Sequence, residues 1–236
     1  MLVLGIDTAT PIAGVALVNE NGVVASRLVS GTRSHSVRLL PMIRDVLREG
    51  QAEAGDLGGL AVTTGPGSFT GLRIGLVCAR TLARVWRLPL AGVSTLEVLA
   101  FPLAGSEVLV VPMLNARRGE VYTGVYRAVQ GRPVCLAGPV AVPPQGLSGI
   151  MEPFDGRFVA TGDGVPVCRE VLAHLNRETR EAPPVAWAPR ADCLAQLGAL
   201  LLAEGLGGDP LAVVPRYVRL PEAEVVWRQR YGGGLG

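Results

Sequence analysis

Hydrophobic and polar residues alternate at the start of the chain in a pattern typical of β-structure. Residues 2–6 form a short apolar run that ends in Asp7 and a polar turn. Residues 12–29 then predict a β-hairpin whose strands are joined at Asn21-Gly22, a dipeptide that favours tight turns. The chain therefore begins with three predicted strands, and the first of them ends in a carboxylate.

The same layout returns further along the chain. Residues 107–114 predict a strand that ends at Asn115, and residues 120–134 predict a hairpin that turns near Gln130-Gly131. A repeat of strand, polar turn and hairpin, each followed by helical segments, predicts an α/β fold with two similar halves. The second half carries fewer regular segments, so we expect it to be reduced.

Apolar residues at helical spacing and short β-runs predict the remaining elements. In the first half we expect helices over residues 36–49, 71–87 and 95–101, and strands over residues 57–64 and 90–94. Pro41 lies inside the first helix and should tighten or kink its first turns. In the second half we expect a strand over residues 157–161 and helices over residues 168–176 and 192–204.

These elements divide the chain into two subdomains and a tail. The first subdomain covers residues 1–103, and the helix at 192–204 is expected to complete it. The second, smaller subdomain covers residues 104–190, and an extended tail covers residues 213–236.

Composition excludes some kinds of chemistry. The 236 residues are 49% hydrophobic with a net charge of +2, which is enough for a large core and gives no global electrostatic signature. All 22 basic residues are arginine, which excludes a Schiff-base lysine and the lysine of a P-loop. Four cysteines without CxxC spacing, each among apolar neighbours, predict buried, reduced thiols. Without a signal-peptide pattern or a membrane-length apolar run, we expect a cytoplasmic protein.

The glycine-rich stretch TTGPGSFTGLRIG, residues 63–75, is the first candidate for chemistry. It joins a strand to a helix that Ser68 or Thr70 can cap, and such a helix start can bind a phosphate. Two similar halves around a cleft are also the layout of the actin, sugar-kinase and Hsp70 superfamily, in which the first turn faces a nucleotide phosphate. The candidate vestigial phosphate site consists of Asp7, Thr8, Thr10, Gly65, Gly67 and Ser68. A purely structural turn, in which Asp7 bonds its own backbone, explains these residues equally well.

Other candidates for chemistry are weaker. The histidines, His35 and His174, stand in no metal-binding pattern, and no serine lies in a GxSxG elbow, so we assign no catalytic or metal-binding residue. A polar turn at the start of the second half could bind an anion or a partner, or it could simply be a solvent-exposed turn at the end of a hairpin. Its residues are Asn115, Arg117, Arg118 and Glu120.

Six motifs together resemble one family. IDTAT…GVAL, SHSVRLLPMI, TTGPGSFTGLRIG, GVSTLE, NARRGEVY and PRYVR occur in the order and approximate spacing of the bacterial TsaB (YeaZ) family. The resemblance covers residues 1–127 well and the remainder thinly, apart from PRYVR. It implies an actin-like (ASKHA) fold and a role in forming N6-threonylcarbamoyladenosine at position 37 of tRNAs that read ANN codons.

The resemblance implies a helper subunit and not an enzyme. Family members are generally regarded as non-catalytic and pair with the catalytic subunit TsaD, and a nucleotide-hydrolysing subunit, TsaE, docks on the pair. The catalytic relatives carry a metal-binding His-x-x-x-His motif where this chain has Thr95 and Leu99, which cannot ligate a metal as imidazole does. The resemblance implies no cofactor beyond ATP or ADP at an interface with partner subunits, and contact with tRNA only through the complex.

The family's dimer face, with TsaD or with a second copy when the chain is alone, corresponds to the first two helices. A small-residue stripe on the second helix allows close approach of a partner helix or of the chain's own core. The expected contact residues are His35, Leu39, Met42, Ile43, Gly71, Arg73, Gly75, Ala79 and Ala83. Apolar residues on two stripes of helix 36–49 support this face, because one core face needs fewer. Asn115 replaces an aspartate of many members, which would weaken any contact of that turn with a cation.

Three alternatives stay open. The first is an autonomous actin-like ATPase or kinase that uses Asp7, with TGDG at 161–164 as the second half of a phosphate cage. The second is a glycoprotease-like peptidase, which the missing histidine pair disfavours. The third is direct tRNA binding, against which the net charge of +2 argues. The arginines it would use are Arg73, Arg80, Arg84 and Arg87.

Overall fold

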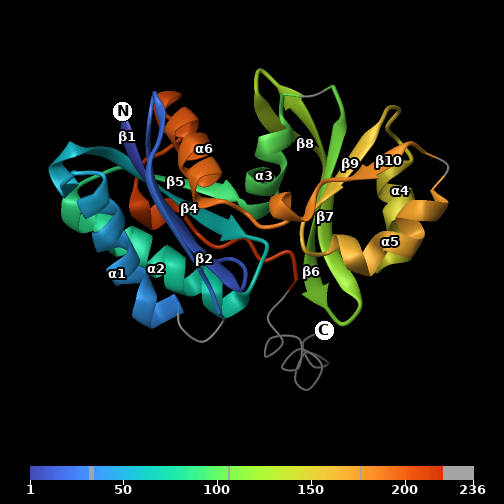
Figure 1. Cartoon of the computed structure of the whole chain (residues 1–236), viewed down its shortest axis with the longest axis horizontal. Helices are drawn as coiled ribbons and strands as arrows, with labels where there is room; N and C mark the ends of the chain where they lie inside the picture. The colour runs from blue at the N-terminus through green and yellow to red at the C-terminus, as the bar shows by residue number, and fades with distance from the viewer. Residues whose placement is uncertain (32–34, 106, 176, 220–236) are drawn as a thin grey trace, which may run out of the picture.

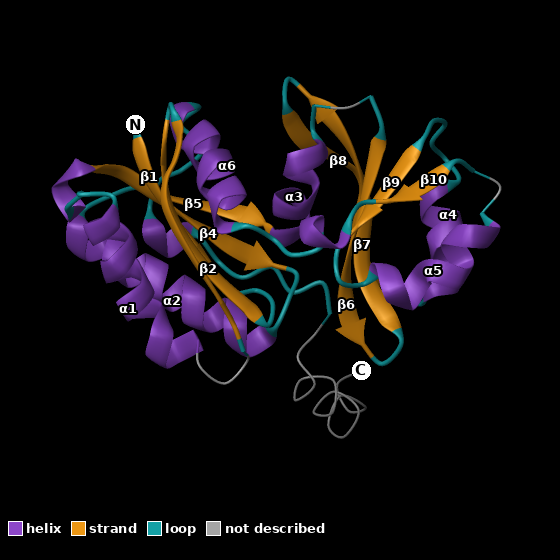
Figure 2. Ribbon diagram, viewed as in Figure 1, coloured by secondary structure: helices purple, strands orange, loops and turns teal. Residues whose placement is uncertain are grey.

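Each half of the chain forms one five-stranded mixed sheet, and the two sheets lie side by side with helices around them (Figures 1 and 2). The computed structural model describes residues 1–31, 35–105, 107–175 and 177–219. The part of the predicted tail beyond residue 219 lies outside the described residues. In the described ranges no helix is long and apolar enough to cross a membrane.

The first sheet combines an antiparallel meander with two parallel strands, in the order β3-β2-β1-β4-β5. Its strands are β1 (Leu2–Asp7), β2 (Ile12–Asn19), β3 (Gly22–Ser30), β4 (Leu57–Gly65) and β5 (Leu90–Ser94). Helices α1 (His35–Glu49) and α2 (Phe69–Trp86) cover one face, and α6 (Ala191–Ala203) packs on the other. The central strands β1 and β4 read as continuous apolar runs because both faces of the sheet are buried.

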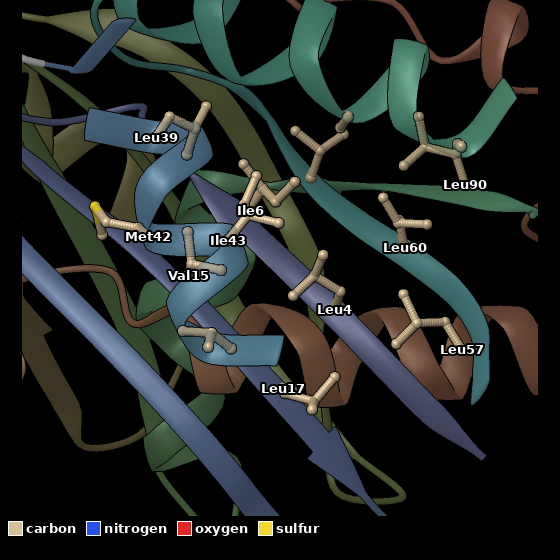
Figure 3. Packing of buried hydrophobic residues seen from close by; sticks show 14 of the residues in the cluster. Leu4, Ile6, Val15, Leu17, Leu39, Met42, Ile43, Leu57, Leu60 and Leu90 are labelled. Atoms are coloured by element: carbon tan, nitrogen blue, oxygen red, sulfur yellow. The ribbon is translucent and has the colours of Figure 1, made fainter. Parts of the chain in front are cut away.

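The main core lies between this sheet and the pair α1 and α2. Figure 3 shows the α1 side chains Leu39 and Ile43 against Leu4 and Ile6 of β1, and all four are at most 3% exposed. Pro41 lies within α1, and the helix runs without a break from His35 to Glu49. The core therefore fixes the inward faces of both helices and leaves their outward faces to solvent.

The second sheet repeats this arrangement in the order β10-β9-β6-β7-β8. Its strands are β6 (Leu109–Arg117), β7 (Glu120–Val129), β8 (Arg132–Val142), β9 (Phe158–Thr161) and β10 (Thr179–Glu181). Helices α4 (Leu147–Met151) and α5 (Val165–His174) pack on one face. The meander β6-β7-β8 with parallel β9 and β10 matches the first sheet strand for strand, which confirms the predicted pair of similar halves.

Helix α3 (Thr95–Ala100) joins the two halves. Its side chains Leu96 and Leu99 form one buried cluster with Val110, Leu114 and Tyr126 of the second sheet. Short 3-10 helices complete the chain: Ala54–Asp56, Phe101–Leu103, Pro144–Gly146, Pro184–Ala186 and Pro210–Ala212.

A second connection is the segment 213–219, which we call the strap. The backbone N–H of Arg216 donates to the carbonyl oxygen of Thr64 at 2.7 Å, at the end of β4. Arg219 forms an ion pair with Glu120 at the start of β7. The strap therefore runs from the first half to the second (Figure 1).

The structure confirms the predicted free thiols and buries only two of the four. All four cysteines are free; Cys168 and Cys193 are buried and Cys78 and Cys135 are half-buried. Burial raises the pKa of the Cys78 and Cys168 thiols to about 11, so these side chains are unreactive hydrophobic groups.

Candidate functional site

Asp7 ends β1 and is 1% exposed. Its Oδ1 accepts hydrogen bonds from the backbone N–H of Ala9 at 3.0 Å and from Thr63 Oγ1 at 2.7 Å. Its Oδ2 is buried without a hydrogen-bond partner among the described residues. Burial raises the pKa of the Asp7 carboxyl to about 6, because the loss of solvation outweighs these hydrogen bonds.

The turn after Asp7 packs directly against the start of α2. Thr8 Oγ1 donates to the carbonyl oxygen of Gly71 at 2.8 Å, and the backbone N–H of Ser68 donates to the carbonyl oxygen of Ala9 at 2.7 Å. A Cβ on Gly71 would lie 2.1 Å from the oxygen of Thr8, and one on Gly67 would lie 2.3 Å from that of Ala9. These glycines are needed for the close approach of two backbones.

The structure thus brings the candidate phosphate residues together and places them against one another. Ser68 caps α2, as the sequence predicts, and its Oγ accepts from the backbone N–H of Gly71 at 3.2 Å. Thr10 binds the backbone of Ile12 through its hydroxyl at 3.2 Å, and the carbonyl oxygen of Arg216 lies 2.6 Å from where a Cβ of Gly65 would be. The side-chain hydroxyls of this turn are therefore satisfied by the chain itself, whereas Asp7 Oδ2 has no partner among the described residues.

Eight of the nine expected contact residues are buried within the chain itself. Gly75 of the small-residue stripe faces Thr8, because a Cβ at Gly75 would lie 2.2 Å from Thr8 Oγ1. His35 is 5% exposed, and its Nε2 lies 3.0 Å from the carbonyl oxygen of Thr10. The buried members of the set are His35, Leu39, Met42, Ile43, Gly71, Gly75, Ala79 and Ala83.

Arg73 is the one exposed member of that set. Its guanidinium lies 3.9 Å from the ring centroid of Phe69, and its Nε donates to the hydroxyl of Tyr217 at 3.2 Å. Arg80 likewise donates to the carbonyl oxygen of Leu211 at 3.2 Å. Two of the three arginines of α2 therefore hold the C-terminal segment against α2.

An apolar groove lies on the outward side of α1 and α2. Its volume is about 630 Å³. Leu40 and Val77 on its walls are 57% and 62% exposed. It is lined by Ser36, Leu39, Leu40, Phe69, Thr70, Arg73, Ile74, Val77, Cys78, Thr81 and Leu82.

The polar turn of the second half is held by a carboxylate. Asp163 Oδ1 accepts the backbone N–H of Asn115 at 2.9 Å, and Asn115 Oδ1 accepts that of Arg117 at 2.8 Å. Gly162, in the TGDG stretch, approaches Met113 so closely that a Cβ would lie 2.0 Å from its carbonyl oxygen. The second glycine turn therefore also packs on the end of its own first strand, as the first one does.

The residues at the positions of the catalytic relatives' histidine pair do not fit a metal. Thr95 is 0% exposed and Leu99 is 2% exposed, and Leu99 packs in the apolar cluster that joins the two halves. Across the described residues, no group of three or more His, Cys, Asp or Glu side chains could hold a metal ion. Neither side chain supplies an imidazole or carboxylate ligand.

A family model described as TsaD: tRNA N6-adenosine threonylcarbamoyltransferase matches residues 21–227. The TsaB protein of Bacillus subtilis is 33% identical over 96% of this chain and 98% of its own length. The chain belongs to the TsaB family. The Escherichia coli TsaB is 31% identical over 98% of this chain and 99% of its own length.

Solved structures agree with this membership. YeaZ from Pseudomonas aeruginosa has a TM-score of 0.79 at 30% identity, covering 92% of this chain and 99% of that chain. The ROK hexokinase of Thermus thermophilus has a TM-score of 0.53 at 13% identity, covering 87% of this chain and 100% of that chain, which concerns the fold alone. The predicted actin-like fold is therefore confirmed for this TsaB-family chain.

Two lining residues of the groove in this TsaB-family chain, Leu39 and Arg73, are among the contact residues expected from the sequence, whereas its exposed apolar residues Leu40 and Val77 are not. Leu40 and Val77 lie on the outward faces of their helices, next to the buried residues of the expected contact set. The sequence signal for the groove was the excess of apolar residues on α1, because Val37 and Leu40 are apolar but are not buried in the core.

Proposed function

We propose that this chain is a non-catalytic subunit that supports a TsaD-like transferase in forming N6-threonylcarbamoyladenosine at position 37 of ANN-reading tRNAs. Family membership supports the pathway, since the full-length relatives are named tRNA threonylcarbamoyladenosine biosynthesis protein TsaB. The observation that carries the subunit role is the groove of about 630 Å³ between α1 and α2, whose walls are apolar and exposed.

The proposed occupant of the groove is the corresponding helix pair of a TsaD-like protein. The family model that matches this chain is described as TsaD, so a TsaD-like protein is expected to carry two helices in the same places. Two such pairs can pack face to face around an approximate two-fold axis. A second copy of this chain would offer the same surface, and we expect it to occupy the groove only when the TsaD-like protein is absent. A TsaE-like ATPase is expected to bind the pair, with ATP or ADP at that interface.

The non-catalytic part of the proposal is supported by two features. Thr95 and Leu99 are buried, Leu99 lies in the apolar cluster that joins the two halves, and neither side chain offers an imidazole or carboxylate ligand. The turn that follows Asp7 is packed against α2 through the Thr8–Gly71 and Ser68–Ala9 hydrogen bonds. An ATPase or kinase built on Asp7 would first have to open this turn.

The proposal is tested by pairing and by turnover. Val77→Asp places a charge on the groove wall, and we expect it to weaken co-elution with a TsaD-like protein by at least about tenfold, because burying a valine contributes roughly 1.5–3 kcal/mol. The matched control is Val185→Asp, at an 83% exposed valine of the second half. Formation of the modified nucleoside is then measured with the TsaD-like protein, the tRNA and the threonylcarbamoyl donor.

We expect modification to need both proteins and to fall with Val77→Asp only. Product formed by this chain alone would contradict the non-catalytic role. Equal pairing of the Val77 and Val185 variants would contradict the groove as the contact surface. Hydrolysis of ATP by the isolated chain that disappears in Asp7→Asn would favour the enzyme alternative.

A further inference from the structure

Five arginines gather where the strap crosses between the two halves. They come from the first turns of α2, from the strap and from the turn between β6 and β7, three segments that converge below the two sheets in Figure 1. We call this set the arginine band. Its members are Arg73, Arg117, Arg118, Arg216 and Arg219.

Side-chain contacts tie these three segments to one another. Arg219 donates to the carbonyl oxygen of Ala116 at 3.5 Å and forms an ion pair with Glu120, which joins the strap to the β6–β7 turn. Arg73 donates to the hydroxyl of Tyr217 at 3.2 Å, which joins the strap to α2. The band is therefore a built surface and not a chance grouping of mobile side chains.

The backbone of the turn presents its arginines outward. Arg117 and Arg118 have φ values of 63° and 55°, and Gly119 follows at 75°. Two successive arginines in this left-handed region are unusual, because the conformation costs free energy for residues with a Cβ. Both arginines are exposed, as are Arg73 and Arg216.

The band holds more arginines than nearby carboxylates. Glu120 is paired with Arg219, and Asp163 accepts the backbone N–H of Asn115. Glu97 is half-buried, and its pKa is raised by burial although Arg216 acts against that shift. Five arginines against these three carboxylates leave a positive surface where the strap meets the β6–β7 turn.

An aromatic pair borders the band. The rings of Phe69 and Tyr217 have centroids 5.0 Å apart, and both side chains are partly exposed. Aromatic faces beside guanidinium groups are the combination that binds unpaired bases and the backbone next to them. An acidic protein surface would be attracted by the arginines but would have less use for the rings.

We propose that the arginine band binds the phosphate backbone of the substrate tRNA beside its unpaired loop, which gives this chain a direct contact with RNA. The proposal rests on the proposed function, which names tRNA as the substrate. It replaces the α2 arginines considered from the sequence, since only Arg73 of that set belongs to the band.

The test compares two double charge reversals in the full chain. Arg117→Glu with Arg216→Glu removes two exposed charges from the band and keeps the backbone contacts. Arg84→Glu with Arg180→Glu makes the same change in net charge at exposed positions outside it. The probe is an unmodified transcript of a tRNA that reads an ANN codon, and its affinity is measured by fluorescence anisotropy over a salt series, for the chain alone and paired with a TsaD-like protein.

Each phosphate contact contributes about 0.9 to the slope of log affinity against log salt, so two lost contacts cost about 30-fold at roughly 0.15 M salt. We expect this loss, and a slope shallower by about 2, in the band variant and not in the control. Equal losses in both variants, or no salt-dependent affinity of the unmutated chain in either form, would overturn the proposal. So would a band variant that loses the TsaD-like partner but keeps its tRNA affinity, which would identify an acidic protein surface as the ligand.

Pairing measured separately distinguishes this proposal from the proposed function. If the unmutated chain does not pair with the TsaD-like protein, the proposed function fails whatever the affinity for tRNA. If pairing persists and the band variant binds tRNA normally, only the present proposal fails. Melting of both variants by circular dichroism shows that the fold is retained.

Discussion

Replacement of Gly75 by alanine should destabilise the protein although the substitution lies within a helix. A Cβ at this position would lie 2.2 Å from Thr8 Oγ1, and Thr8 Oγ1 is itself bonded to the carbonyl oxygen of Gly71. The new methyl group therefore has to displace the turn after β1 or break this hydrogen bond.

The expected magnitude follows from three effects. Overpacking of a tight contact costs about 1–3 kcal/mol, and loss of the Thr8 hydrogen bond costs about 1 kcal/mol. Alanine in place of glycine inside a helix stabilises the folded state by about 1 kcal/mol, because alanine has the higher helix propensity. The net loss is therefore about 1–3 kcal/mol, or roughly 2–12 °C in Tm for a chain of this size.

Urea denaturation of a double-mutant cycle measures the effect. Thr8→Ala removes the atom that the new methyl group would meet, so Gly75→Ala should cost at least about 1 kcal/mol less in that background. Gly149→Ala is the matched control, since Gly149 lies in α4 with no atom within 4 Å of its added Cβ, and it should be neutral or stabilising.

Two results would refute this reasoning. If Gly75→Ala behaves like Gly149→Ala, the close approach of α2 to the Thr8 turn does not exist. If Gly75→Ala keeps the stability of the chain and abolishes pairing with a TsaD-like protein, the small-residue stripe is a docking face after all.

Two further predictions concern a buried carboxyl and the strap. The pKa of Asp7 is raised from 3.8 to about 6 in the folded chain, so the folded state binds the extra proton between these values and stability should fall as pH rises from about 4 to 6. The difference between the unmutated chain and Asp7→Asn in urea midpoints across this range should show the slope, and parallel curves would contradict it. Arg219→Ala should speed hydrogen exchange in residues 115–120 and lower Tm by no more than about 4 °C, since a partly exposed ion pair contributes at most about 1 kcal/mol. The same change at Arg180, which pairs with Glu178 at the surface, should leave exchange in residues 115–120 unaltered, and an equal response there would contradict the role of the strap.

Alternation and helical spacing predicted the first half of the fold and much of the second, because each reports which side of an element is buried. Strand β8 runs to Val142, eight residues beyond the predicted hairpin, and helix α4 was not predicted. The hairpin at Asn21-Gly22 and the helix over residues 36–49 lie within one residue of β2, β3 and α1 as observed. Strand β10 was not predicted, since its three residues, Thr-Arg-Glu, have no apolar pattern. Helix α5 begins three residues earlier than expected, with Pro166 in its first turn, where a missing N–H costs nothing.

The orientation of α2 could not be predicted in the same way. A stripe of glycine and alanine predicts that something approaches closely, and it does not indicate whether that neighbour belongs to the same chain. The neighbour is the polar side chain of Thr8, which lies far away in sequence. The exposed groove, in contrast, left a signal in the surplus apolar residues Val37 and Leu40 of α1, because an apolar residue that the core does not bury has to be explained by a contact elsewhere.

The glycine-rich turn of residues 63–75 shows how a chain can keep a phosphate-like motif for structural reasons. A helix N-terminus binds a phosphate through backbone N–H groups that have no other acceptor. Here the N–H of Ser68 donates to the carbonyl oxygen of Ala9, and the N–H of Gly71 donates to Ser68 Oγ. A phosphate would have to displace both acceptors and reopen the contact at Gly67, so the motif is retained because it fixes α2, and thereby the groove wall at Val77, to the end of β1.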